Sequence, residues 1–361
     1  MPAAPIIVIE DDPFLRVMQI VLDPQTSAER VAAFADFFSH DEPDFAGYCA
    51  RVRARATGLF PAEVRLVDSP DELRAALPDA RAAVLESLAF GRTEIAAARN
   101  LKVVQKYGVG LRTIDSEACA ERGIKVLTIR RRANIACAEH VLCLMLAQAK
   151  MTKRLTGRIS AGALAEIGFP YRPFDRRHTP YSNWPRIRGV RMLNAATLGI
   201  IGLGEIGREI ALRANAFGMR VVYYQRTPLP EAEERQMQIS YATLDNLLAQ
   251  SDWVVPQLPG GPGLADLIDR PQLARMKPGA LIVNVSRPDV INRAALIEAL
   301  QSGHLGGFAL DPQYQVPGRD DDELLQFDNV MLTPHIAAQP RFNALDDFAE
   351  MIEVLAREIR A

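Results

Sequence analysis

The sequence has no excess of charge of either sign and no long apolar run. Its 361 residues include 42 lysines and arginines against 44 aspartates and glutamates, which gives a formal net charge of -2. A protein that binds a phosphate backbone needs an excess of cations, so the composition argues against nucleic acid as a partner. The longest apolar stretches, Val141 to Ala147 and Ala195 to Gly204, are far shorter than the roughly 18 residues that a membrane span requires.

The N-terminus and the cysteines exclude further classes. No basic-then-apolar leader opens the chain, so we expect a cytoplasmic protein with no membrane partner. No Cys-x-x-Cys pair occurs, so we expect neither a disulfide framework nor a metal site from the four cysteines, which are Cys49, Cys119, Cys137 and Cys143.

Two series of short apolar strands alternating with helices dominate the rest of the chain. The first series has five strand-like runs, at 6–9, 64–67, 83–85, 103–104 and 125–127. The second has six, at 197–201, 221–224, 253–258, 280–285, 308–310 and 330–332. This alternation predicts an α/β protein with two doubly wound parallel sheets.

Four segments interrupt this alternation. Aromatic and charged residues at 14–62 predict an inserted helical segment, and residues 168–188, rich in proline and arginine, predict a long loop. A helix beginning at Asn134 and running to Ala149 has more apolar residues than one domain core needs. Helical spacing at 343–359 with no strand after it predicts a terminal helix that packs on the first domain.

A glycine-rich loop joins the first strand of the second series to its helix. Gly202 allows the tight turn, Gly204 lets the backbone approach a pyrophosphate, and Gly207 lets the helix pack on the strand. Glu205 and Ile206 complete the loop, and the first helical amides face the anion. Because this loop follows a buried strand and precedes an amphipathic helix, it predicts a Rossmann-type dinucleotide site.

The end of the next strand bears on the choice of dinucleotide. An NAD-preferring site would have a carboxylate at Gln225 to hold the ribose hydroxyls, whereas this chain continues with Arg226 and Thr227. A cation and a hydroxyl suit a 2′-phosphate, so NADP is favoured over NAD. Alternatively, Arg226 is a solvated strand-end residue and either cofactor binds.

Further motifs occur in the order and spacing of one family. They are Lys106 to Asp115, Ala138 to His140, Ala274 to Ala280, Val283 to Arg287, Gly306 to Asp311 and Leu332 to His335. The chain resembles a D-isomer-specific 2-hydroxyacid dehydrogenase, and residues 286–292 are most similar to glyoxylate/hydroxypyruvate reductases. The resemblance implies a Rossmann domain at 134–334 inserted in a flavodoxin-like substrate domain at 1–133 and 335–361. It also implies a homodimer built on the helix from Asn134 to Ala149.

The resemblance implies roles for individual residues. Arg287 pairs with the substrate carboxylate and polarises the keto oxygen, and His335 is the acid/base. Asp311 lies near the nicotinamide carboxamide, and Pro259 lines the cofactor site. Substrate also contacts Ser87, Val109 and Gly110. The expected function is hydride transfer between NAD(P) and a 2-keto or 2-hydroxy acid, a small-molecule carboxylate.

One position departs from the family. The family has a glutamate that hydrogen-bonds the histidine, and Val316 stands at the matching position. Three explanations remain open: another carboxylate (Asp289 or one of Asp320 to Asp322) takes its place, the chemistry needs no proton, or catalysis is lost or redirected. The last predicts a nicotinamide-binding regulatory protein, or a non-redox lyase or isomerase with bound cofactor.

Overall fold

The computed structural model describes residues 4–180 and 184–360. The chain divides into two compact units: residues 1–135 with 338–361, and residues 136–337. Part of the predicted 168–188 loop, the first three residues and the last residue lie outside the description. The helix α7 (Arg132–Ala149) begins in the first unit and continues in the second. It starts two residues before the predicted position, Asn134.

The first unit is built on a parallel sheet whose order is β2-β1-β3-β4-β5, which is the flavodoxin-like order. Its strands are β1 (Ile6–Glu10), β2 (Glu63–Val67), β3 (Ala82–Leu85), β4 (Val103–Lys106) and β5 (Lys125–Leu127). Its helices are α1 (Arg16–Leu22), α2 (Ala28–Phe38), α3 (Phe45–Arg55), α4 (Pro70–Ala76), α5 (Arg92–Ala97), α6 (Ser116–Glu121) and α15 (Phe342–Arg360).

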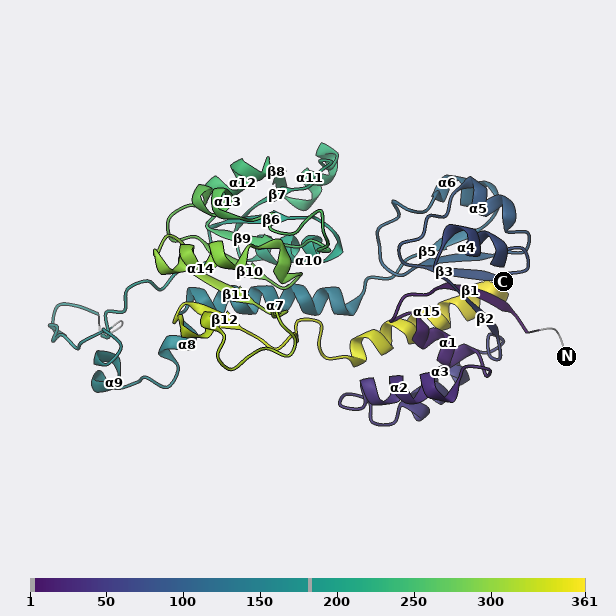
Figure 1. Ribbon diagram of the computed structural model, residues 1–361, viewed down its shortest axis with the longest axis horizontal. Coiled ribbons are helices and arrows are strands. Elements are labelled where there is room, and N and C mark those ends of the chain that lie inside the picture. Colours follow the sequence, from purple (N-terminus) through teal and green to yellow (C-terminus); the bar gives the residue numbers. More distant parts are fainter. Residues whose placement is uncertain (1–3, 181–183, 361) are drawn as a thin grey trace. The chain divides into compact units, whose positions relative to one another are not determined.

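Helices cover both faces of this sheet because its strands are apolar on both faces (Figure 1). Ile7 and Ile9 pack with α1, α3 and α15, whereas Val8, between them in β1, packs with α4, α5 and α6 on the opposite face. The helices at 14–62 and the return of the C-terminal helix to the first unit are therefore both confirmed. Ser69 caps α4, since its side chain accepts a hydrogen bond from the N–H of Glu72.

The second unit is built on a seven-stranded parallel sheet whose order is β12-β11-β10-β9-β6-β7-β8. Its strands are β6 (Thr197–Ile201), β7 (Arg220–Tyr224), β8 (Ile239–Tyr241), β9 (Trp253–Pro256), β10 (Leu281–Asn284), β11 (Gly307–Leu310) and β12 (Val330–Leu332). Its helices are α8 (Thr152–Leu155), α9 (Ala161–Ala165), α10 (Glu205–Ala216), α11 (Glu231–Met237), α12 (Leu244–Gln250), α13 (Arg270–Arg275) and α14 (Arg293–Gln301), with 3-10 turns η1 (Pro288–Val290) and η2 (Glu323–Gln326).

The order of this sheet reverses at β6, with β7 on one side and β9 on the other, as in Rossmann folds. The prediction of six strands was wrong by one, because β8 was missed. β8 has three residues at the sheet edge and only Ile239 is buried, so it has no apolar pattern to detect. In a parallel sheet all carboxyl ends lie along one edge, so the loops after β6, β7, β9, β10, β11 and β12 share that edge.

Candidate functional site

The glycine loop follows β6 at the reversal point of the sheet. Gly202 has φ +96°, and a Cβ built on it would lie 2.3 Å from the carbonyl oxygen of Gln257. A Cβ on Gly207 would lie 2.5 Å from the carbonyl oxygen of Gly202. Both positions therefore require glycine for internal packing.

Gly204 differs from the other two glycines, since a Cβ there would meet no described atom within 4 Å. Gly204 is the N-cap of α10, and no side chain caps the first N–H groups of this helix. The positive end of the helix dipole therefore faces this open space. This open space leaves room for a ligand to approach the backbone at Gly204. This geometry fits the pyrophosphate of a dinucleotide, and Glu205 and Ile206 form the first turn beside it.

The residues that bear on cofactor choice follow β7. The Gln225 amide donates to the carbonyl of Thr227 at 2.7 Å, which closes a short turn, and Arg226 and Thr227 are exposed. The side chain of Arg226 is thus available at the strand end where the dinucleotide ribose is held in Rossmann folds.

Arg287 lies in the loop that follows β10, and its backbone is fixed by a buried amide. Asn284, fully buried at the end of β10, donates to the carbonyl of Arg287 at 2.8 Å and accepts from the N–H of Ser286 at 2.8 Å. The guanidinium is exposed, with one bond of 2.9 Å to the carbonyl of Ser286. Asn284 was not singled out from the sequence, although an amide inside a strand otherwise composed of Leu, Ile and Val was the available signal.

The loop after β9 packs against Arg287. A Cβ on Gly260 would lie 2.8 Å from Cγ of Arg287, so only glycine lets the two loops approach this closely. Pro259, immediately before it, is exposed at the same edge of the sheet. Arg287 and Pro259 are thus brought together by adjacent strands, as a site at the carboxyl edge requires.

His335 follows β12 in a left-handed backbone conformation with φ +58°. Its N–H donates to the carbonyls of Asp311 at 3.0 Å and Thr333 at 2.9 Å. His335 is exposed and, within the described part of the chain, its imidazole has neither a hydrogen bond nor an ion pair. A non-glycine residue with positive φ needs such support from its surroundings, and such residues concentrate at functional sites.

Asp311 provides that support from a fully buried position. Its carboxylate accepts from the Thr333 hydroxyl at 2.6 Å and from the N–H groups of Ile336 and Ala337 at 2.9 and 2.8 Å. His140 lies 3.5 Å from the same carboxylate. Burial raises the pKa of Asp311, but the hydrogen bonds outweigh it and bring the pKa down to about 2. The sequence predicted that Asp311 lies near the cofactor. It did not predict that the Asp311 carboxylate positions the segment that carries His335.

None of the carboxylates considered as a substitute for the missing glutamate is bonded to His335. Asp289 accepts from the N–H of Gly261 at 3.4 Å. Asp321 pairs with Arg319 and Asp322 with Arg293, each at 2.7 Å. Val316, at the family's glutamate position, is 69% exposed.

The first unit carries the other predicted substrate residues at the carboxyl ends of β3 and β4. Ser87 follows β3, and Val109 and Gly110 follow β4, all three exposed. Glu10, buried at the end of β1, accepts from the N–H groups of Glu86, Ser87 and Leu88 at 2.7 to 3.0 Å. Burial raises the pKa of Glu10, but its bonds to the Ser87 hydroxyl and to these N–H groups lower it overall.

Glu10 therefore holds the backbone of the Ser87 loop. This role of Glu10 was not predicted from the sequence, although a carboxylate directly after the strand Ile6 to Ile9 was the available signal.

Neither a metal-binding cluster nor a membrane-spanning helix is found in residues 4–180 and 184–360. No group of three or more His, Cys, Asp or Glu residues there could hold a metal ion. No helix in that part of the chain has the length and apolar character needed to cross a membrane.

Comparison with known proteins identifies the family. Residues 173–337 match the model of the D-isomer specific 2-hydroxyacid dehydrogenase, NAD binding domain. The chain is 32% identical to a hydroxypyruvate reductase of Thermotoga maritima, over 80% of this chain and 88% of that protein. It is 34% identical to a D-3-phosphoglycerate dehydrogenase of Mycobacterium leprae, over 81% of this chain and 52% of that protein, so it spans about half the length of that relative.

A solved structure agrees with these matches. The crystal structure of the TT0316 protein from Thermus thermophilus is 30% identical and aligns with 85% of this chain and 91% of its own, with a TM-score of 0.50. The chain therefore belongs to the D-isomer-specific 2-hydroxyacid dehydrogenase family, and its second unit is the NAD-binding domain of that family.

Proposed function

We propose that this chain is an NAD(P)-dependent oxidoreductase that transfers hydride between the cofactor and a 2-keto or 2-hydroxy acid. The observation that carries the proposal is the carboxyl edge of the second sheet, where the open backbone at Gly204, the exposed Arg287 and the supported His335 all lie. Bound nicotinamide would supply the hydride. Nucleotide binding is assigned to the second unit, and the substrate roles of Ser87, Val109 and Gly110 on the first unit rest on the resemblance.

The chain's own groups have distinct tasks in this proposal. Arg287, whose charge is permanent, holds the substrate carboxylate and polarises the keto oxygen. His335 gives a proton to that oxygen during reduction and takes it back during oxidation. Asp311 does not touch substrate but keeps the backbone of His335 in its left-handed conformation.

The assay is oxidation of NADPH or NADH with glyoxylate, hydroxypyruvate and other 2-keto acids. Arg287→Ala should lose about a thousandfold in kcat/KM, as expected when a charged bidentate contact to a reacting group is removed. Arg235→Ala, on the exposed surface of α11, is the matched control and should keep normal activity. Normal turnover by Arg287→Ala would refute the proposal, and so would cofactor binding without turnover on the whole panel.

The preference for NADP over NAD is part of the proposal. It rests on the absence of a carboxylate at Gln225 and on the exposure of Arg226. Gln225→Asp should weaken NADPH binding about tenfold or more relative to NADH, because its charge repels the 2′-phosphate. An unchanged ratio of the two dissociation constants, measured by fluorescence titration, would contradict this preference.

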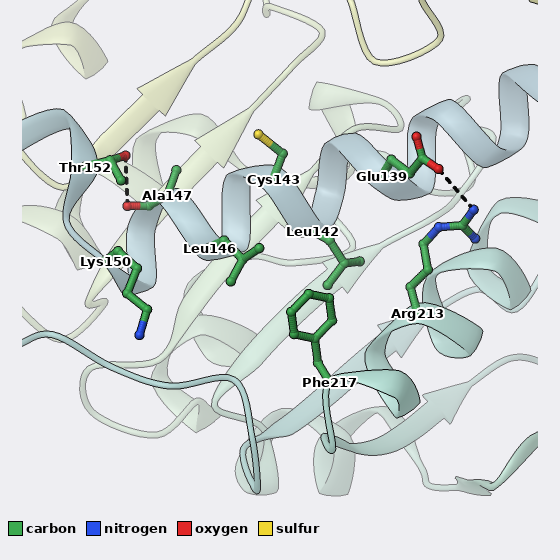
Figure 2. A pocket seen from close by; sticks show the side chains of 9 residues that line it. All are labelled: Glu139, Leu142, Cys143, Leu146, Ala147, Lys150, Thr152, Arg213 and Phe217. Carbon is green, nitrogen blue, oxygen red and sulfur yellow. Dashed lines mark hydrogen bonds and ion pairs between the residues drawn. The ribbon is translucent and has the colours of Figure 1, made fainter. Parts of the chain in front are cut away.

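We also propose a homodimer formed through α7. A hollow of about 630 Å³ lies between α7 and α10 and is lined mainly by apolar atoms. Figure 2 shows Leu142 and Leu146 of α7 pointing toward Phe217, which is 41% exposed. Burial in a two-fold contact removes this surface from water. Sedimentation should give a dimer at micromolar concentration, and Phe217→Arg should shift it to monomer; a monomeric wild type would exclude the assembly.

The regulatory and non-redox alternatives receive no support from the relatives. Those compared above that carry functional names are a reductase and a dehydrogenase. A cytoplasmic location stays a prediction from the sequence.

A further inference from the structure

The chain passes between its two units twice, and α15 is involved in both passages. The first passage lies within α7, between residues 135 and 136, and the second lies between residues 337 and 338, just before α15. α15 packs beside α1 and α3 of the first unit (Figure 1). The bonds at the start of α7 and of α15 therefore decide how firmly the first unit holds each passage.

A buried carboxylate of α15 holds the first passage. The backbone N–H of Arg132, the first residue of α7, donates to the carboxylate of Asp347 at 2.9 Å, and the Arg132 guanidinium bonds the same carboxylate. A further bond of 2.8 Å joins this guanidinium to Glu350. Asp347 is fully buried, and its charge lies at the N-terminus of α7, where a carboxylate is favourable. The start of α7 is thus fixed to the first unit.

The inserted helices α2 and α3 hold the second passage. The carboxylate of Asp41, in the loop between them, accepts from the backbone N–H of Arg341, the residue before α15. The Arg341 guanidinium lies over the ring of Phe37 in α2, with 5.3 Å between its central carbon and the ring centroid. The Tyr48 hydroxyl in α3 donates to the carbonyl of Leu345 at 2.7 Å, in the first turn of α15. Three contacts from the insertion therefore fix the start of α15.

On the other side of the second passage, the second unit holds the chain as far as Ala337. The N–H groups of Ile336 and Ala337 donate to the buried Asp311 carboxylate, and the N–H of His335 donates to the Asp311 carbonyl. Ala337 is itself buried. The chain is therefore held at Ala337 by the second unit and at Arg341 by the first.

Only Ala338, Gln339 and Pro340 lie between these two points. Within residues 4–180 and 184–360, no hydrogen bond is made to the backbone of Ala338 or of Gln339. Pro340 has no N–H, and its ring fixes φ. The backbone dihedral angles of Ala338 and Gln339 are therefore the ones that can change without breaking a bond.

We propose that residues 338–340 are the flexible link of the second passage, and that Asp41 is a positioning residue that keeps this link short. The function proposed above gives the link a use, because the predicted cofactor residues belong to one unit and the predicted substrate residues to the other. His335 lies on the second-unit side of the link, so its imidazole moves with Arg287 and the glycine loop. The inserted segment thereby acquires a role: it keeps the start of α15 from loosening into the link, so that donor and acceptor of the hydride are better aligned.

Amide hydrogen exchange of the full chain, resolved to single residues by mass spectrometry, tests the link without any substrate. The amides of Ala338 and Gln339 should exchange fast, with protected amides at Ala337 and Arg341 on either side. In Asp41→Ala the Arg341 amide should exchange about fivefold faster or more, whereas Ala337 keeps its protection. Slow exchange at Ala338 and Gln339 would overturn the proposal, and so would an Arg341 amide that stays protected in Asp41→Ala.

Turnover tests the positioning role, and this part rests on the proposed hydride transfer. Asp41→Ala should lower kcat with a 2-keto acid about threefold or more but leave the dissociation constant of NADPH unchanged, because the glycine loop belongs to the second unit. Asp41→Asn should restore kcat, since the asparagine oxygen in this variant can accept the same bond.

Asp36→Ala, on the exposed surface of α2, is the control and should change neither exchange nor kcat. A wild-type kcat in Asp41→Ala, measured where the Arg341 amide has lost its protection, would exclude the positioning role. Absence of turnover in the wild type would refute the proposed function instead, and the exchange pattern would still decide whether residues 338–340 are the link.

Discussion

Replacing Asp311 with asparagine should destabilise the second unit by a predictable amount. The pKa of Asp311 falls from an ordinary 3.8 to about 2, and each pKa unit corresponds to about 1.4 kcal/mol. The ionised carboxylate therefore contributes about 2.5 kcal/mol to the free energy of unfolding at neutral pH. The asparagine side chain in this variant also turns an N–H₂ group toward one of the donors, such as the N–H of Ala337, so we expect a total loss of about 3 kcal/mol.

The pH dependence follows from the direction of the shift. A depressed pKa gives stability that is fully present above the unfolded value and is lost as the pH falls through the folded value. The difference between wild type and Asp311→Asn should therefore be constant near pH 7 and should narrow between about pH 4 and pH 2, where the wild-type carboxyl becomes protonated.

Urea unfolding followed by tryptophan fluorescence can measure this for the second unit alone. The chain has two tryptophans, Trp184 and Trp253, and Trp253 is buried in β9. In a Trp184→Phe background the signal comes only from Trp253. Asp321→Asn, on the surface and paired with Arg319, is the control and should cost about 0.5 kcal/mol or less. A loss below about 1 kcal/mol in Asp311→Asn, or a difference that does not narrow in acid, would refute the reasoning.

Substitutions at four further positions test the site. Gly204→Ala should have the melting temperature of the wild type but bind NADH and NADPH at least about tenfold more weakly. Gly202→Ala should lower the melting temperature, because φ at this position is +96° and the added Cβ would meet a carbonyl oxygen. Calorimetry and cofactor titration of the same samples measure both effects. Glu10→Gln should raise KM for keto acids more than it lowers kcat, since it loosens the Ser87 loop, and an unchanged KM would count against that role. Val316→Glu should extend reduction to higher pH by about one unit in kcat/KM profiles, and an equal effect from uncharged Val316→Gln would exclude a charge effect.

Much of the architecture and the glycine loop could be predicted because they depend on local backbone requirements. Gly202 and Gly207 are glycines for reasons of close approach within one strand-turn-helix unit, and the spacing of that unit is written in consecutive residues. The central strands β3, β6 and β10 are buried on both faces, so they appear as continuous apolar runs. β8 lacked such a run because an edge strand with one buried residue has no pattern.

The supporting carboxylates could not be assigned from sequence because their partners are distant along the chain. Glu10 holds residues 86–88, and Asp311 holds a segment more than twenty residues later together with His140 from α7. A sequence shows that a carboxylate ends a strand but not which N–H groups the fold brings to it. Gln148 is a similar case, since an amide at the end of an apolar helix is visible in the sequence, whereas the lack of a hydrogen-bond partner for its side chain among the described residues is not.

In the segment that carries His335, placing the imidazole and assisting its protonation depend on different residues. Placing the imidazole depends on Asp311, which fixes the backbone of Thr333 to Ala337, and that arrangement is complete in this chain. Assisting its protonation depends on a neighbouring carboxylate, and the position that supplies one in the family holds Val316. Gln313 still ties the loop carrying Val316 to the carbonyl of Thr333, so the loop and the histidine segment remain connected although the carboxylate is absent. The bonds that hold the backbone of His335 at φ +58° are therefore all present. The geometry therefore favours a reaction in which the position of His335 is retained and its proton is supplied without the glutamate.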